Sequence, residues 1–184
     1  MPWLQKVSHA ILSEDRVYRY ALYRSLDGQA WDRIYEHNSV PQERRTVLFI
    51  MLNPSTASEE QNDPTIEKLM KFSRRWGYDR LVVGNLFAYR ETDSTKLASL
   101  ASARDIVGPD NNAHIDRLVE ESHRVVCAWG KQGTILGRGD AVRRYLGPRL
   151  ADRGQELWCF KKNLDNSPVH PLYQPDAAEL IEYR

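Results

Sequence analysis

Short apolar runs alternate along the chain with longer polar segments in which hydrophobic residues recur every three or four positions. Four apolar runs are continuous, as is typical of strands covered on both faces: residues 46–52, 80–88, 124–130 and 155–160. An earlier run, residues 17–26, places Tyr18, Tyr20 and Leu22 on one face, and this alternation predicts a half-buried strand.

The segments between these runs carry helix signals. Residues 63–77 begin with Asp63 as a cap and Pro64 in the first turn, and Gly77 can end the helix. Further helices are predicted within residues 92–100, 108–123 and 138–150, and a short C-terminal helix after the proline-rich turn at residues 168–175.

Strands that alternate with helices imply crossover connections and a mostly parallel sheet between helical layers. We therefore predict one α/β domain over residues 1–184, with three α/β/α layers around a four-strand, mostly parallel sheet. Residues 17–26 are expected to form an antiparallel strand at its edge. The length of 184 residues is near the usual size of one domain.

The composition is ordinary for a globular protein, with 41% hydrophobic and 28% charged residues. No apolar run approaches the roughly 20 residues that a membrane span needs, and the first residues do not resemble a secretory signal. The cysteines, Cys127 and Cys159, lie in apolar runs and are predicted to be buried free thiols. We expect a cytoplasmic protein without membrane contact, with a monomer favoured.

Polar residues stand where the predicted parallel strands end, and such strand ends form the ligand-binding edge of an open α/β sheet. Asn85 would have to satisfy its amide inside an apolar strand, whereas Asn53 could merely close a turn and Trp129 could belong to the core. The residues at this edge are Asn53, Pro54, Ser55, Asn85, Trp129, Gly130 and His170.

Several chemistries lack a signal in the sequence. The five histidines have neither the paired spacing nor the carboxylate neighbours of a metal-ligand set, and no glycine-rich phosphate loop or G-x-S-x-G elbow occurs. We therefore expect no metal and no cofactor.

The net charge is only +1, but basic residues gather between positions 131 and 153. A basic face of this kind can follow the phosphates of a nucleic acid, although it can equally be the solvated surface of a helix. The candidates for contacts with a nucleic-acid backbone are Lys131, Arg138, Arg143 and Arg144.

The order of the motifs MLNPS, VVGNLFA, VVCAWG and SPVHPLY resembles the uracil-DNA glycosylase superfamily. A closer resemblance, from about Tyr18 to Tyr173, is to the family called domain of unknown function 1643, which carries LNPSTA, DPT, NLFA, GP, AWG and HPLY. The remoter resemblance implies a glycosylase-like fold that binds a nucleobase.

That resemblance also implies roles for individual residues. Asn53 would hold the attacking water, Asn85 would read the polar edge of an extruded base, and His170 would stabilise the departing base. An amide cannot accept a proton, so a carboxylate such as Asp63 is needed nearby, and an aspartate at position 53 would keep or raise activity. Leu172 is a candidate wedge, and the candidates for stacking on the base are Phe72, Phe87 and Tyr89.

The sequence thus predicts a nucleobase-binding enzyme that hydrolyses an N-glycosidic bond in DNA or a nucleotide. The alternative is a non-catalytic module for nucleic acid or nucleotides on the same fold. A hydrolase unrelated to bases ranks lower, because no nucleophile–base pair can be recognised in the sequence.

Overall fold

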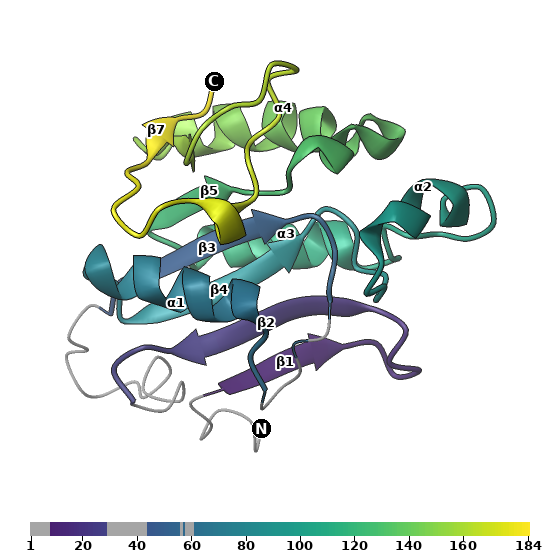
Figure 1. Cartoon of the computed structure of the whole chain (residues 1–184), viewed down its shortest axis with the longest axis horizontal. Coiled ribbons are helices and arrows are strands. Elements are labelled where there is room, and N and C mark those ends of the chain that lie inside the picture. The colour runs from purple at the N-terminus through teal and green to yellow at the C-terminus, as the bar shows by residue number, and fades with distance from the viewer. Residues whose placement is uncertain (1–7, 29–43, 56, 58–60) are drawn as a thin grey trace.

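The computed structural model describes residues 8–28, 44–55, 57 and 61–184. In these residues the strands form one mixed sheet of seven, in the order β1-β2-β4-β3-β5-β6-β7 (Figure 1). The strands are β1 (Ser8–Leu12), β2 (Arg19–Ser25), β3 (Thr46–Met51), β4 (Arg80–Asn85), β5 (Arg124–Cys127), β6 (Leu157–Cys159) and β7 (Ile181–Glu182).

The predicted parallel strands are present, but the sheet around them is larger than the sequence suggested. β4, β3, β5 and β6 pair in parallel, and antiparallel strands extend this group on both sides. The strand within residues 17–26 is antiparallel to β4, as predicted, but the prediction that it is half-buried and lies at the edge of the sheet is wrong. β2 lies between β1 and β4, and six of its seven residues are buried.

The alternation predicted for β2 breaks at a β-bulge. Ile11 pairs with Ala21 and Leu12 pairs with Arg19, so Tyr20 has no pairing partner in β1. Tyr20 stacks on His114, whereas Leu22 packs in the core on the other face of the sheet. A bulge adds one residue to a strand and so reverses the faces that follow it.

Helices cover both faces of the sheet. α1 (Pro64–Arg75) packs on one face, and α3 (Asn111–Glu120) and α4 (Arg138–Ala151) pack on the other (Figure 1). Each face has one hydrophobic core, and α3 and α4 share the core on theirs. The remaining helical elements are short: η3 (Ser94–Lys96), α2 (Leu97–Leu100), η4 (Lys131–Gly137) and η5 (Pro171–Tyr173). No helix in the described parts of the chain has the length and apolar character to cross a membrane.

The predicted ends of α1 are confirmed. Asp63 Oδ1 accepts a hydrogen bond of 2.9 Å from the backbone N–H of Ile66, which is otherwise unpaired in the first turn. Gly77 has a φ of 72°, the left-handed conformation that commonly ends a helix. Cys127 and Cys159 are buried free thiols, as predicted.

The predicted C-terminal helix is wrong. Residues 181–182 form β7 instead, which pairs antiparallel with β6 through Cys159 and Ile181. Tyr183 accounts for this outcome, because its ring is buried against Trp129 and its hydroxyl donates to the carbonyl of Asn166 at 3.1 Å. Burial of a large aromatic ring outweighs the weak helix preference of so short a segment.

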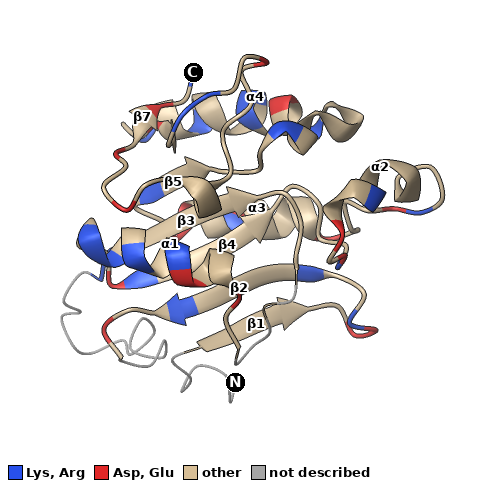
Figure 2. Cartoon of the chain, viewed as in Figure 1, with Lys and Arg blue, Asp and Glu red and all other residues tan. Residues whose placement is uncertain are grey.

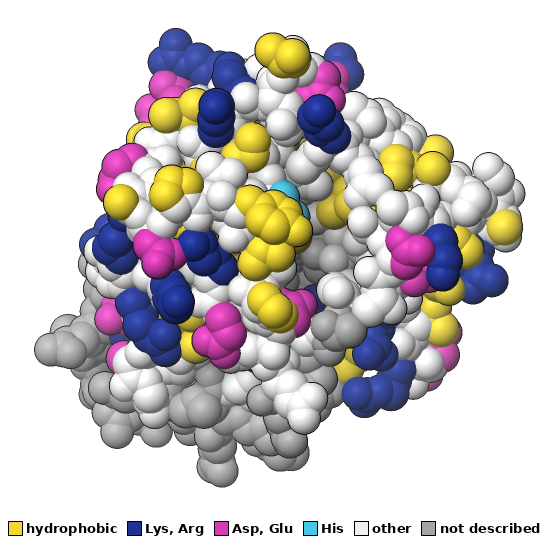
Figure 3. All heavy atoms as spheres, in the orientation of Figure 1, with side chains coloured by type: hydrophobic (Ala, Val, Ile, Leu, Met, Phe, Trp, Pro, Cys, Tyr) yellow, Lys and Arg dark blue, Asp and Glu magenta, His cyan; other side chains and the backbone are white. Residues whose placement is uncertain are grey.

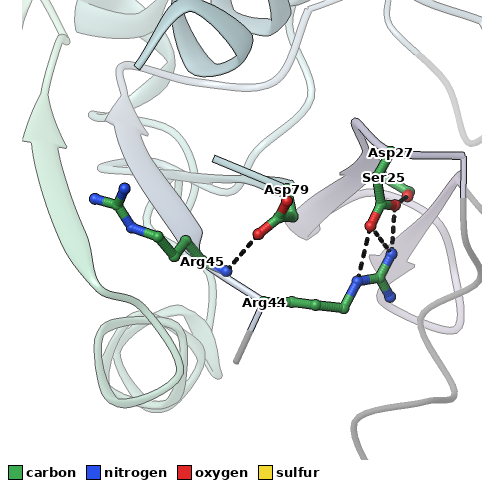
Figure 4. Close-up of polar contacts among 5 residues, drawn as sticks. All are labelled: Ser25, Asp27, Arg44, Arg45 and Asp79. Carbon is green, nitrogen blue, oxygen red and sulfur yellow. Dashed lines mark hydrogen bonds and ion pairs between the residues drawn. The ribbon is translucent and has the colours of Figure 1, made fainter. Parts of the chain in front are cut away.

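Polar contacts join the strands at the amino-terminal edge of the parallel group (Figure 4). The backbone N–H of Arg45, just before β3, donates to the Asp79 carboxylate at 2.8 Å, just before β4. Arg44 Nε donates to Asp27 at 2.9 Å, and this contact ties the start of β3 to the turn after β2. These contacts lie at the opposite end of the parallel strands from Asn53 and Asn85.

Gly108 gives a test of this packing. Its φ is 91°, and an added Cβ would lie 3.0 Å from Tyr18 and 3.1 Å from Ala88, so we expect Gly108→Ala to lower the free energy of unfolding by about 2–4 kcal/mol. Gly154→Ala is the control, because its φ of 66° brings similar backbone strain but no group outside its chain neighbours lies within 4 Å of its Cβ position, so it should cost only about 1–2 kcal/mol. Denaturant unfolding of both variants measures the difference, and equal stabilities would contradict it.

Candidate functional site

A cavity of about 450 Å³ opens at the carboxyl ends of the parallel strands. Its walls come from the loops after β3, β5 and β6, from the end of β4 and from the first turn of α1. The structure brings most of the predicted site residues together here: Asn53, Ser55, Asp63, Asn85, Trp129, Gly130, Lys131 and His170. Figure 3 shows a histidine side chain at the edge of a hollow, beside a group of hydrophobic side chains.

Asn85, the last residue of β4, has the least satisfied side chain in this cavity. It is 1% exposed, and neither Oδ1 nor Nδ2 has a hydrogen-bond partner among the described residues. A buried amide without partners costs about 1–3 kcal/mol, which a ligand with a matching donor and acceptor would remove. The amide therefore marks the part of the cavity where a ligand with an adjacent hydrogen-bond donor and acceptor would bind best.

The backbone around Asn85 is held from behind by Asn111, a residue that the sequence analysis did not single out. Asn111 Nδ2 donates to the carbonyls of Asn85 and Leu86 at 3.0 and 3.1 Å. Arg138 Nε also donates to the Leu86 carbonyl, at 3.2 Å, and a second Arg138 nitrogen donates to Asn112. Arg138, predicted to contact a nucleic-acid backbone, thus supports the end of β4 and does not line the cavity.

The Asn53 side chain is partly committed to its own loop. Nδ2 donates to the carbonyl of Pro54 at 3.1 Å and to that of Glu91 at 2.6 Å, so the loop after β3 is fastened to the loop after β4. Only Oδ1 remains to bind a ligand or a water. Asn53 can therefore accept a hydrogen bond from a water molecule, but its amide N–H groups are already used.

The ring of His170 is held in one tautomer. Its Nδ1 accepts a hydrogen bond of 3.3 Å from the backbone N–H of Leu172, so Nε2 carries the proton of the neutral ring. Burial lowers the pKa of His170 below its usual value, and the charge of Asp63 partly opposes this shift. At neutral pH His170 is an uncharged ring with one N–H donor in the cavity wall.

Two carboxylates line the cavity. Asp63 uses Oδ1 to cap α1, and its second oxygen is available to the cavity. Glu91 lies beside Asn53, and its Oε1 accepts from the backbone N–H of Asp93 at 2.9 Å. The sequence analysis named Asp63 but missed Glu91, because no motif distinguishes that glutamate from a surface residue.

Trp129 and Gly130 form a rigid wall. The indole is 2% exposed and lies so close to Gly133 that a Cβ there would come within 2.1 Å of its Cδ1. Gly130 has a φ of 73°, and its N–H donates to the carbonyl of Pro168 at 2.9 Å. This bond joins the loop after β5 to the segment that carries His170.

Other predicted residues lie outside the cavity. Phe87 is 0% exposed and Phe72 packs on Trp76 and Phe160, so neither can stack on a ligand without rearrangement of the core. Pro54 is buried within the loop after β3 and Leu172 is half-buried on η5, and neither lines the cavity.

The basic residues of α4 are also placed away from the cavity wall. Arg143 and Arg144 both pair with Asp140 one turn earlier on the same helix, and of the four predicted backbone contacts only Lys131 lines the cavity. Figure 2 shows lysine and arginine spread along α1 and α4. Among the described residues, no group of three His, Cys, Asp or Glu side chains could hold a metal ion.

The tautomer and charge of His170 can be tested by NMR titration of its ring. We expect a pKa below the ordinary 6.5, and Asp63→Asn should lower it further because the attracting carboxylate is lost. Asparagine still caps a helix, so α1 should remain intact. The unfolding free energy should fall as the pH drops from about 6.5 through the folded-state pKa, because the unfolded chain binds the proton more readily. A pKa above 6.5 in the wild type would contradict this assignment.

Asn53 gives a second test. Asn53→Ala should lower the free energy of unfolding by about 1 kcal/mol, because two loop hydrogen bonds are lost. Asn53→Asp should cost more, about 1–3 kcal/mol, because its carboxylate would face two carbonyl oxygens instead of donating to them. Thermal melts of the two variants decide this point, and an aspartate variant as stable as the wild type would contradict it.

Comparison with known proteins gives one match. The profile of the family described as "Protein of unknown function (DUF1643)" matches residues 19–172. No curated protein and no solved structure matches the chain significantly. The matched segment spans the cavity residues from Arg19 to His170, and the chain therefore belongs to the DUF1643 family.

Proposed function

We propose that this protein is a nucleobase-binding enzyme of DNA-glycosylase type, which hydrolyses the N-glycosidic bond of a base in DNA or in a nucleotide. The observation that carries the proposal is the buried, unpartnered amide of Asn85 in the cavity at the sheet edge. An amide offers one acceptor and a donor pair side by side, which matches the adjacent polar groups on the edge of a nucleobase.

The other cavity residues fit the steps of such a reaction. The C–N bond breaks with its electron pair going to the base, and the Nε2–H of His170 can hydrogen-bond the charge that develops on a base oxygen. A water then bonds to the sugar carbon and gives its proton to a carboxylate, for which Asp63 and Glu91 are the candidates. Asn53 Oδ1 would orient that water by accepting a hydrogen bond from it.

One observation favours the alternative, a module that binds a base or nucleotide without cleaving it. The amide nitrogen of Asn53 donates hydrogen bonds to the carbonyls of Pro54 and Glu91, which join the loops after β3 and β4. These bonds give Asn53 a structural role that would be needed even in a protein without catalytic activity. Under this alternative the cavity would retain Asn85 for recognition, and its carboxylates would not act on water.

A screen for base release tests the proposal. Oligonucleotides and nucleotides that carry normal, modified and mismatched bases are incubated with the protein, and free bases are measured by mass spectrometry. For a released base we expect Asp63→Asn or Glu91→Gln, whichever removes the general base, to slow the chemical step by about 10²–10⁴-fold. Asn85→Ala should abolish discrimination between bases, because the recognising amide is lost.

The control is Glu120→Gln, which changes an exposed glutamate at the end of α3, outside the cavity, and should leave base release unchanged. If base-dependent binding is lost with Asn85→Ala but no base is released from any substrate, the binding module is the better account. If the wild type and Asn85→Ala bind every base equally, neither function stands.

A further inference from the structure

A second hollow of about 390 Å³ lies next to the first cavity. The two share three wall residues, Ser55, Glu91 and Thr92, so a ligand bound at these residues would be within reach of both. Beyond this shared wall the second hollow is lined by residues of the turn before β2 and of the loop after β4: Arg16, Val17, Tyr89 and Arg90.

Arg19 lines the first cavity. Arg19 and Ala21 would share a face in a regular strand, but the bulge at Tyr20 separates them, and Arg19 lines the cavity while Ala21 packs in the core with α3. Arg19 is 4% exposed and donates through Nη1 to the carbonyl of Ala57, whereas its buried Nε has no partner among the described residues. Burial lowers its pKa to about 10, so it remains a cation at neutral pH.

Arg90 lines the second hollow, next in sequence to the shared residue Glu91. It is exposed, and its Nη1 donates to the carbonyl of Arg16, another residue of that hollow, at 3.0 Å. The charge of Arg90 contributes to the lowered pKa of Arg19, so the two cations are near enough to repel each other. An anion between them would relieve this repulsion.

The surroundings can accommodate such an anion despite two carboxylates. Ser55 and Thr92 offer hydroxyl donors on the shared wall. Asp63 attracts Arg19 but also caps α1, and Glu91 accepts from the N–H of Asp93, so both carboxylates have partners of their own. Arginine is the residue that best matches the paired oxygens of a phosphate.

We propose that the junction of the two hollows, between Arg19 and Arg90, is a phosphate-binding subsite for a nucleotide whose base occupies the first cavity. The assignment of the base rests on the proposed function, but the affinity for phosphate does not. The subsite assigns the substrate class as a phosphorylated nucleoside or a nucleotide within a strand, and excludes a free base or an unphosphorylated nucleoside as the best ligand.

Titration with inorganic phosphate at low ionic strength, followed by NMR of the ¹⁵N-labelled protein, tests the subsite directly. Saturable shifts are expected at the amides of Ser55, Glu91 and Thr92. Arg90→Ala should weaken phosphate binding about tenfold, the size expected for one charged hydrogen bond. Arg90 is the residue to change because it is exposed, whereas replacement of the buried Arg19 could prevent folding.

Arg117→Ala is the matched control, because it removes an exposed arginine from α3 on the other face of the sheet and should leave phosphate binding unchanged. Absence of saturable shifts, or equal affinities of the Arg90 and Arg117 variants, would overturn the subsite. Asn85→Ala separates this test from that of the proposed function. It should keep phosphate binding and lose only the added affinity of a nucleoside 5′-monophosphate over phosphate. The phosphate subsite and the base site can therefore be contradicted independently of each other.

Discussion

β3 hydrogen-bonds in parallel to β4 on one side and to β5 on the other, with Met51 opposite Asn85 and Ile50 opposite Cys127. Because the chain leaves β3 through α1 on one face of the sheet and leaves β5 through α4 on the other, the loops that follow β3 and β5 separate to opposite sides of the sheet. A crevice at such a point is the usual ligand site of open α/β sheets, and this pairing brings Asn53, Asn85 and Trp129 to one edge of the sheet.

Two buried polar side chains at this crevice lower the stability of the folded protein when no ligand is bound. Asn85 and Arg19 both hold atoms without partners among the described residues, at a cost of roughly 1–3 kcal/mol each. Asn111 holds the backbone at Asn85, and the β-bulge at Tyr20 places Arg19 on the cavity side of the sheet. Specific contacts therefore keep both polar side chains at the crevice. Strain and unsatisfied polarity of this kind concentrate at functional sites, which is why both proposals rest on these two residues.

Much of the parallel layer followed from local patterns, because continuous apolar runs and a capped helix are decided within a few residues. The strands at the edges of the sheet could not be predicted from local patterns. The burial of β2 depends on its pairing with β4, and β7 depends on the contact of Tyr183 with Trp129, and both contacts join residues far apart in the sequence. For the same reason the cavity residues at strand ends could be predicted from their motifs, whereas Arg19 and Glu91 could not. Arg19 enters the cavity only through the bulge, and Glu91 only through the loop bond from Asn53.

The two thiols of the parallel layer have a practical consequence. Cys127 and Cys159 lie in neighbouring strands, both are 0% exposed, and burial raises the pKa of each, so the reactive thiolate is scarce in the folded protein. A single cysteine introduced on the surface would therefore carry a spectroscopic label without removal of the native pair. The rate at which the native thiols are modified would in turn report how often β5 and β6 open to solvent. A ligand that binds in the cavity without changing this rate would show that the cavity and these strands are not coupled.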